Sequence, residues 1–177
     1  MSYINLKKID KKPCCFLDRD GVINHDFNYI YKIKDFKWKT GVKKAIKFLN
    51  KKKYLVIVIS NQAGVAHGFF KEKHVKILTN YINKDLETAD AYIDKFYYCF
   101  YHPTAKVKKY KKRSLLRKPE AGMLNQAFKD FLILKNKSFF IGDRLIDKIC
   151  AKKKNLKFYY AEKNLFKQIK KILCNKL

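Results

Sequence analysis

A continuous apolar run, Tyr54–Ile59 (YLVIVI), constrains the fold of this chain more than any other feature. Its β-branched residues are typical of a strand that is covered on both faces, as strands inside parallel sheets are. Shorter runs of this kind predict further strands at 14–17, 93–100, 138–141 and 156–160. Apolar residues at helical spacing predict helices at 42–49, 75–86, 123–132 and 164–174. Because strands and helices alternate, we expect βαβ units and an α/β fold with a mainly parallel sheet.

The chain shows no internal repeat and no linker rich in Gly, Ser or Pro, so we expect one domain that spans residues 1–177. No apolar run approaches the ~20 residues that cross a membrane, and the stretch at 14–17 is too short for a signal peptide. We therefore expect a cytoplasmic protein with no membrane partner, whose thiols are reduced. The five cysteines are Cys14, Cys15, Cys99, Cys150 and Cys174.

The charge balance is strongly basic, with 42 Lys and Arg against 15 Asp and Glu and a formal net charge of +27. One interpretation is a polyanionic partner such as nucleic acid. The other is a lysine-rich composition spread over solvated faces. We favour the second, because the lysines are dispersed along almost the whole chain and no ordered motif of stacking aromatics accompanies them. Under either interpretation, the positive field concentrates anionic substrates.

Polar residues follow three of the predicted strands. They are Asp18–Gly21 (DRDG), Ser60–Gln62 (SNQ) and Gly142–Arg144 (GDR), with Asp147 one helical turn further on. In parallel sheets, ligands gather at the carboxyl ends of the strands. Asp and Gly also end strands and cap helices without any other role, but three such segments together favour a site at this edge.

The residue types at these ends suit phosphoryl transfer. Asp18 and Asp20 lie two apart, so in an extended segment their carboxylates point to the same side. Such a pair, completed by Asp143, predicts a Mg²⁺ site, because hard oxygen ligands suit this ion. Asp18 can attack phosphorus and form an aspartyl-phosphate, while Asp20 serves as general acid and base. Ser60 and Lys118 offer donors to the phosphoryl oxygens.

Four segments resemble, in order, the motifs of the haloacid dehalogenase superfamily. They are Phe16–Asn24 (FLDRDGVIN), Ser60–Ala66 (SNQAGVA), Arg117–Pro119 (RKP) with Gly122-Met123, and Ile141–Asp147 (IGDRLID). More narrowly, the sequences of these motifs are similar to those of the branch that contains heptose 1,7-bisphosphate 7-phosphatases and histidinol-phosphate phosphatases. The motifs span residues 16–147, which is most of the chain.

This resemblance implies a Rossmann-like, doubly wound sheet with a minimal cap made of loops only. It implies that Asp18 is nucleophile and metal ligand, and that Asp20 is the acid/base and binds metal through its backbone carbonyl. Asp143 would be a further metal ligand, with Arg144 beside the metal. Ser60 and Lys118 would stabilise the phosphoryl group. Candidates for substrate binding are Arg19, Asp26, Phe27, Asn28, Tyr29, Asn61, Gln62 and Arg117.

The sequence departs from the family at a zinc-binding loop. Of the four ligand positions, only Cys99 keeps a ligand, and the others are Tyr101, Ser114 and Leu116. A structural zinc ion takes four N or S ligands, so we predict that zinc is absent. Without zinc, the basic loop 101–116 is expected to be an extended, mobile lid that closes over substrate; the alternative is a loop pinned by Tyr101 and Tyr110.

A second departure is His67, which stands where the family commonly has arginine. It is expected either at the surface of a helix entry or in contact with substrate.

These observations favour a Mg²⁺-dependent phosphatase that acts on a small anionic sugar phosphate as a monomer. D-glycero-D-manno-heptose 1,7-bisphosphate, losing its 7-phosphate, is the first candidate substrate, and histidinol phosphate is the second. A polynucleotide 3′-phosphatase that exploits the positive charge is a further alternative, although the DRDGVIN and SNQ wording argues against nucleic acid. A binding protein without activity ranks last, because all the essential aspartates are present.

Overall fold

The computed structural model describes residues 10–174, and its centre is one five-stranded sheet in which every strand pair is parallel. The strand order is β3-β2-β1-β4-β5, so the chain moves outward from β1 in one direction and then in the other. This doubly wound α/β arrangement was predicted. The strands are β1 (Cys14–Leu17), β2 (Leu55–Asn61), β3 (Lys95–Cys99), β4 (Phe139–Gly142) and β5 (Lys157–Tyr160).

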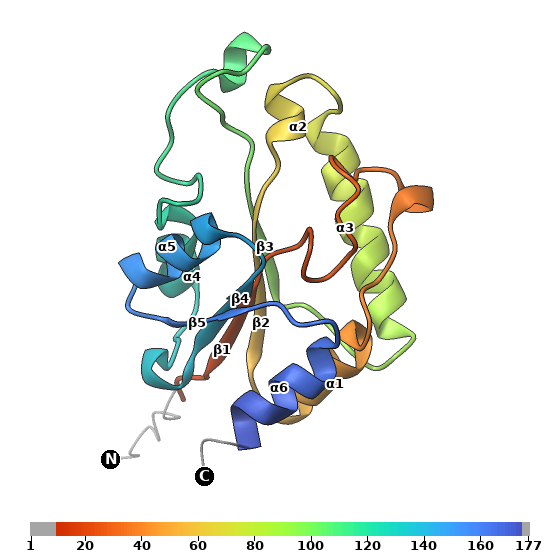
Figure 1. The fold of residues 1–177 in the computed structure, drawn as a ribbon, viewed down its shortest axis with the longest axis vertical. Coiled ribbons are helices and arrows are strands. Elements are labelled where there is room, and N and C mark those ends of the chain that lie inside the picture. Colours follow the sequence, from red (N-terminus) through yellow and green to blue (C-terminus); the bar gives the residue numbers. More distant parts are fainter. Residues whose placement is uncertain (1–9, 175–177) are drawn as a thin grey trace, which may run out of the picture.

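Helices cover both faces of the sheet (Figure 1). On one side lie α1, α3 and α6, and on the other lie α4 and α5. A short helix, α2, follows β2 directly. The helices are α1 (Val42–Lys51), α2 (Ala63–Ala66), α3 (Glu72–Glu87), α4 (Gly122–Asp130), α5 (Leu145–Lys153) and α6 (Leu165–Cys174).

The alternation of side chains along the central strands produces two separate cores. Cys15 and Leu17 of β1 face the layer of α1, α3 and α6, whereas Cys14 and Phe16 face α4 and α5. All four side chains are fully buried, as expected for a central strand of a parallel sheet. Burial on both faces fixes the register of the strands, because a shift of one residue would exchange the two cores.

The observed elements differ from the predicted ones mainly at their ends. The strand expected at 93–100 is confined to Lys95–Cys99, and the helix expected at 123–132 ends at Asp130. No helix was predicted at α5, whose buried face is narrow and consists of Asp147, Cys150 and Ala151. The lysines of α5 interrupt the helical spacing of its apolar residues, so this spacing did not predict a helix.

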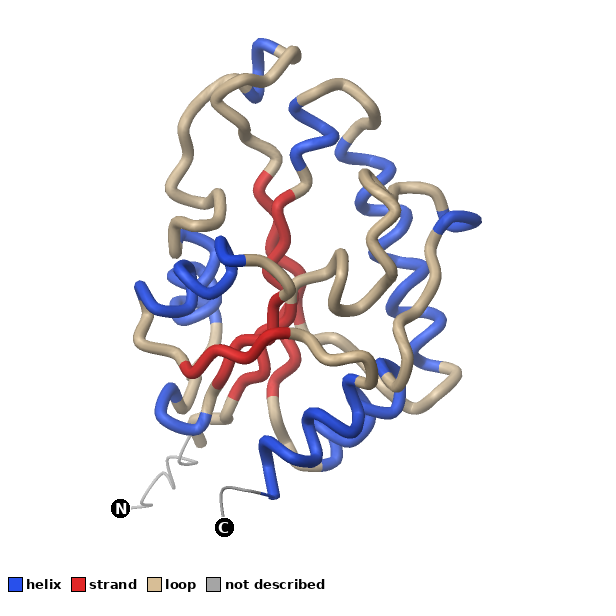
Figure 2. The backbone as a smooth tube through the Cα atoms, viewed as in Figure 1, coloured by secondary structure: helices blue, strands red, loops and turns tan. Residues whose placement is uncertain are grey.

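Long connections gather beyond the carboxyl ends of the strands (Figure 2). Residues 18–41 follow β1 and residues 100–121 follow β3, and each contains only a short 3-10 turn. These connections lie over that edge together with α2 and the start of α5, in agreement with the predicted minimal cap. Within residues 10–174, none of the helices combines the length and the apolar character that crossing a membrane requires.

Candidate active site

Asp18 stands at the carboxyl end of the central strand. Its backbone N–H donates to the carbonyl of Ile141 on β4 at 3.1 Å, so the sheet itself holds the start of the loop. The backbone N–H of Arg19 donates to Asp18 Oδ1 at 2.7 Å and orients the carboxylate. The Asp18 side chain is buried. Because β1 lies between β2 and β4, Asp18 stands at the point where the strand order reverses.

Three carboxylates converge at this point. Oxygens of Asp18, Asp143 and Asp147 all lie within 4.8 Å of one another. Asp143 follows β4, and Asp147 comes from the first turn of α5, where its Oδ2 accepts the backbone N–H of Arg144. Gly21 adopts a φ of +79° and leaves no room for a Cβ beside the Asp143 carboxylate, so glycine is required at this turn.

Burial raises the pKa values of two of these acids, Asp18 and Asp143, and neighbouring charge adds to the shift. Burial, together with the charge of Asp147, raises the pKa of Asp18 to about 7 even though Lys118 opposes the shift. Burial and Asp147 also raise the pKa of Asp143. Within the described residues, the buried Oδ1 of Asp143 has no hydrogen-bond partner. A hard divalent cation fits this donor set, because it would bind the free oxygen and offset the mutual repulsion.

Lys118 is a buried cation inside the acidic cluster. Its Nζ lies 2.8 Å from Asp18 Oδ2 and 2.6 Å from Asp147 Oδ1, and it donates to the carbonyl of Ile59 at 3.0 Å. Burial alone would lower the pKa of Lys118, but Asp18 and Asp147 outweigh that effect and raise it. The lysine predicted to stabilise a phosphoryl group is therefore charged and points at the predicted nucleophile.

The carboxylate of Asp20 does not join the cluster, which corrects the expectation that it would converge with Asp18 on a metal ion. Its Oδ1 accepts hydrogen bonds from Arg19 and Asn24, and its Oδ2 accepts one from Gln62 at 3.0 Å. These donors hold the side chain to one side of Asp18. Asp147, one turn into α5, occupies the place expected for Asp20.

Arg19 is also placed differently from the prediction, which made it a substrate contact. Its side chain is fully buried, and the guanidinium donates to Asp20 and to the carbonyl of Ile30 at 2.7 Å. A buried guanidinium needs such partners. Arg19 therefore positions Asp20 and the loop at Ile30, and it does not reach the cavity.

The end of β2 supplies the polar wall of the site. Ser60 is buried, and its Oγ accepts a hydrogen bond from Gln62 Nε2 at 3.0 Å. Asn61 makes two hydrogen bonds to the backbone of Lys118, one as donor to the carbonyl and one as acceptor from the N–H. Asn61 thus fixes the segment that delivers Lys118.

The loop after β1 supplies the opposite wall. Asn28 and Tyr29 both have positive φ, +62° and +52°, and Asp26 Oδ1 accepts the Asn28 backbone N–H at 3.0 Å. Left-handed backbone is costly for a tyrosine. Here it turns the Tyr29 ring onto Phe69, with centroids 4.7 Å apart. Phe27 instead stacks on His25 away from the site, so its predicted contact with substrate is not supported.

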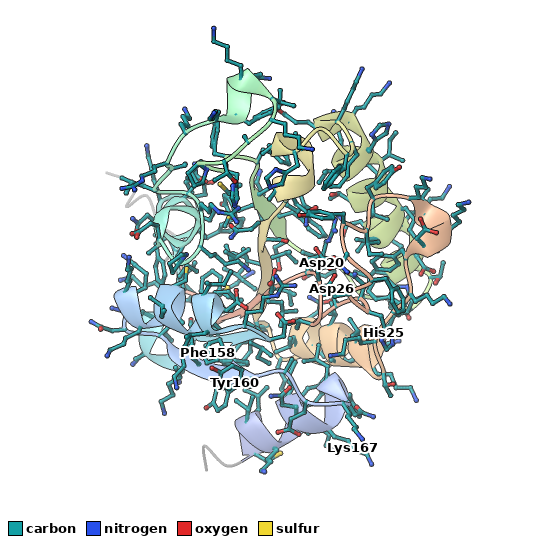
Figure 3. The ribbon with its side chains drawn as sticks, turned by 45° about the horizontal axis from the view of Figure 1, so that its top comes forward. Asp20, His25, Asp26, Phe158, Tyr160 and Lys167 are labelled. Carbon is teal, nitrogen blue, oxygen red and sulfur yellow. The ribbon has the colours of Figure 1, made fainter. Side chains whose placement is uncertain are left out.

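These elements enclose a cavity of about 210 Å³. In Figure 3, Asp20 and Asp26, which both line the cavity, lie close together near the centre of the molecule. Arg144 spans the mouth, and its NH2 lies 2.6 Å from Asp26 Oδ2. The predicted site residues that line the cavity are Asp18, Asp20, Asp26, Asn28, Tyr29, Ser60, Asn61, Gln62, Arg117, Lys118 and Arg144.

Four further residues line the cavity that sequence reasoning did not assign to it: Ala63, Ile146, His102 and His67, the last of which was left open. His67 ends α2, and His102 lies in the connection after β3. A sequence signal existed only for His67, because it replaces an arginine of the second motif. No such signal marked His102, whose approach to His67 depends on the tertiary fold.

Comparison with known proteins identifies the family. The chain matches the family model described as "Polynucleotide kinase 3 phosphatase" over residues 17–170. It is 39% identical over 147 residues to the D-glycero-beta-D-manno-heptose-1,7-bisphosphate 7-phosphatase of Haemophilus ducreyi, covering 82% of this chain and 80% of that one. The chain is a phosphatase of the haloacid dehalogenase superfamily. Both the superfamily and the enzyme class were predicted.

Two further comparisons extend this result. The phosphatase is 36% identical to the D-glycero-alpha-D-manno-heptose-1,7-bisphosphate 7-phosphatase of Photorhabdus laumondii, over 78% of this chain and 75% of that one. Its fold resembles that of the D,D-heptose 1,7-bisphosphate phosphatase from B. bronchiseptica, solved in complex with magnesium and phosphate. That likeness has a TM-score of 0.76 and 22% identity, and it covers 90% of this chain and 86% of the other.

The positions that correspond to the family's zinc ligands lie together in the phosphatase. Cys99, Tyr101 and Leu116 belong to one apolar cluster on the α4 side of the sheet. The hydroxyl of Ser114 interacts with the Cys99 thiol, whose pKa is raised mainly by burial. Apolar and aromatic packing thus occupies these positions, and the absence of zinc stays a prediction.

The loop 101–116 is not the extended segment that its lysines predicted. Residues 108–110 form a 3-10 turn, and the backbone N–H of Val107 donates to the carbonyl of Ala66 at 3.0 Å. The hydroxyl of Tyr110 donates to Glu72 Oε1, and Lys112 lies 4.1 Å from the centroid of the Tyr101 ring. These are the contacts of the alternative, in which Tyr101 and Tyr110 pin the loop. Closure over substrate stays a prediction.

Proposed function

We propose that this phosphatase is a Mg²⁺-dependent enzyme that removes the 7-phosphate of D-glycero-D-manno-heptose 1,7-bisphosphate through an aspartyl-phosphate. The observation that carries the proposal is the likeness to heptose bisphosphate phosphatases at 36–39% identity over about four-fifths of the chain. The site supports it, because the buried Asp18 and the buried Lys118 line one cavity and Asp18 belongs to a cluster of three carboxylates.

In the proposed reaction, Asp18 attacks the phosphorus atom and the bond from phosphorus to the sugar oxygen breaks. Asp20, protonated at that stage, gives its proton to the departing oxygen. Asp20 then takes a proton from water, which attacks the aspartyl-phosphate and releases inorganic phosphate. Lys118 and Ser60 donate to the phosphoryl oxygens, while Arg19, Asn24 and Gln62 keep Asp20 beside the reacting atoms.

The carboxylates of Asp18, Asp143 and Asp147 would hold the Mg²⁺ ion, together with the backbone carbonyl of Asp20 that the family resemblance assigns to it. A bound Mg²⁺ ion would neutralise charge on the transferring phosphoryl group. Support from this chain is the buried Oδ1 of Asp143, which has no hydrogen-bond partner among residues 10–174, and the raised pKa of Asp18. Arg144, beside Asp143, would lie next to the ion and not bind it, since arginine has no free lone pair to offer.

A second candidate function is removal of a 3′-phosphate from a polynucleotide. Two observations favour it: the description of the matching family model, and the net charge of +27. Both are less specific than the similarity to heptose phosphatases. Histidinol phosphate ranks behind both, because only the resemblance of the motifs supports it.

A phosphate-release assay on four substrates distinguishes these functions. The panel consists of the α and β anomers of the heptose bisphosphate, histidinol phosphate and a 3′-phosphorylated oligonucleotide, each with Mg²⁺ and with excess chelator. We expect the highest kcat/KM for one heptose anomer and no turnover in chelator. A higher kcat/KM for the oligonucleotide at 0.15 M salt would replace the proposed function with the second candidate. Full activity in excess chelator would show that the reaction does not need a metal ion. We further propose that the phosphatase is a monomer, consists of a single domain and is cytoplasmic.

A further inference from the structure

Two histidines meet at the rim of the cavity. His67 ends α2 and His102 lies in the connection after β3, yet their ring centroids are only 4.8 Å apart. Backbone hydrogen bonds hold both segments in place, from Val107 to the carbonyl of Ala66 and from His102 to the carbonyl of Tyr110. The pair is therefore built by the fold and does not depend on one flexible side chain.

The proton of neutral His102 has a defined position. The backbone N–H of Thr104 donates to His102 Nδ1 at 3.2 Å, so Nδ1 is the acceptor and the proton is on Nε2. Burial, together with Arg117 and His67, lowers the pKa of His102. His102 therefore offers one N–H donor near neutral pH, and an added negative charge nearby would favour its second proton.

Arg117 joins the two histidines on the rim. It lines the same cavity, and its NH1 makes a long hydrogen bond of 3.4 Å to the carbonyl of Tyr101. Among the described residues, no carboxylate forms an ion pair with Arg117. Two imidazoles and a guanidinium thus share one side of the cavity without an acidic partner.

The acids of the cavity cannot serve as that partner, because each has its own cation. Asp18 pairs with Lys118, Asp20 with Arg19, and Asp26 with Arg144, at 2.8, 2.9 and 2.6 Å. The donors on the rim are what remains after these pairs are made. Such a set matches an anion that arrives with the ligand.

We infer that His67 and His102 are specificity residues that bind a second phosphate of a small substrate, away from the phosphate that Asp18 attacks. This inference rests on the proposed function, since it assigns the remaining phosphate of a sugar bisphosphate to the rim. The cavity of about 210 Å³ suits a small molecule. The Tyr29 ring, 6.5 Å from His67, adds an apolar wall on which the carbon skeleton between the two phosphates can pack.

The test pairs two substrates with matched variants. The substrates are a heptose 1,7-bisphosphate and the same heptose carrying only the 7-phosphate. The variants are His67→Ala and His102→Ala, and the control is His25→Ala, whose side chain is exposed and does not line the cavity. Thermal unfolding of each variant verifies that it folds.

We expect each rim variant to raise KM for the bisphosphate by about tenfold, the effect of one lost hydrogen bond to a charged group. KM for the monophosphate and kcat for both substrates should stay within about twofold, and His25→Ala should match the wild type. An equal rise in KM for both substrates, or no rise for the bisphosphate, would overturn the inference. If the two variants lose activity only toward a 3′-phosphorylated oligonucleotide, the histidines contact a phosphodiester, and the inference is overturned as well.

A direct measurement keeps this inference separable from the proposed function. Inorganic phosphate is titrated into the wild-type protein while the imidazole resonances of its four histidines are followed by NMR. We expect His67 and His102 to shift, and His25 and His74 to stay in place. If the wild type hydrolyses neither heptose phosphate, the proposed function fails, and this titration alone decides whether the rim binds phosphate. Unshifted His67 and His102 resonances would overturn the site.

Discussion

Two regions of the site are built in different ways. We call the residues at the strand ends the floor, namely Asp18, Ser60, Asp143 and the neighbouring Lys118 and Asp147. The rim consists of Tyr29, His67, His102 and Arg117. The floor stands on the ends of three neighbouring strands, and its acids surround one buried ammonium, that of Lys118. The rim comes from connecting loops, and its side chains are partly exposed aromatics and imidazoles. Strand ends are fixed by the sheet, whereas loops tolerate change. This difference agrees with the proposals made above, in which the floor carries out the reaction and the rim selects the substrate.

Asp18→Asn is the largest break in the floor that we predict. An amide is a far poorer nucleophile than a carboxylate, so turnover of every substrate should be abolished. Phosphate release under saturating Mg²⁺ measures this turnover. The comparison variant is Asn28→Ala in the cavity wall, whose loss of activity should differ from one substrate to another. Near-normal turnover by Asp18→Asn would show that the floor acts through a different group.

Asp20→Asn should have the next largest effect. Loss of a general acid/base lowers kcat by roughly 10²–10⁴-fold. The amide still accepts a hydrogen bond through its oxygen, so the contact with Arg19 is partly kept and the fold should be unchanged. The kcat/KM of this variant, which reports the first step, should recover with a substrate whose leaving group needs no proton, such as a nitrophenyl phosphate, whereas kcat stays low because the attacking water still lacks its base. The absence of any such recovery would argue against the proton-transfer role.

Mg²⁺ affinity should depend on pH through the floor and not through the rim. The pKa of Asp18 is about 7 in the metal-free protein, and a carboxylate must lose its proton to bind metal. Protons therefore compete with Mg²⁺ as the pH falls from 8 to 6, and the affinity should fall by up to about tenfold per pH unit below 7. Calorimetric titration measures this slope. Asp18→Asn should bind Mg²⁺ more weakly and with a shallower slope, and an unchanged slope would assign the titration to another group.

The smallest predicted effect concerns the loop that carries part of the rim. Tyr110→Phe removes an exposed hydrogen bond to Glu72. Such a bond contributes about 0.5–1.5 kcal/mol to the free energy of unfolding. Hydrogen exchange in residues 101–116 should accelerate by no more than about tenfold, with little change in the unfolding midpoint. Adding a phosphate analogue with Mg²⁺ tests closure. Equal protection with and without these ligands would mean that the loop is already fixed.

The sequence predicted those parts of the site that follow strand ends. Asp18, Ser60 and Asp143 each come directly after an apolar run, so chain position and spatial position coincide. Asp147 was noted one helical turn after Gly142–Arg144 but was given no role in the site, because the helix α5 was not recognised. Arg19 was wrongly expected in contact with substrate, because a charged residue between two aspartates reads as exposed, whereas here its partners allow it to be buried.

The rim was less accessible to prediction. His67 and His102 are 35 positions apart, and their approach follows from how two loops pack on each other. Repulsion among the lysines of the loop predicted an extended chain, but contacts between Tyr110 and Glu72 and between Lys112 and Tyr101 compete with that repulsion. Local charge counts do not include such partners, since Glu72 lies outside the loop and the Tyr101 ring carries no charge.

The place of Lys118 has a consequence for how the protein matures. Its ammonium offsets part of the negative charge of Asp18 and Asp147, so we expect native packing and magnesium loading to be separable events. An ion that binds the folded form alone would then add to a stability that is already present.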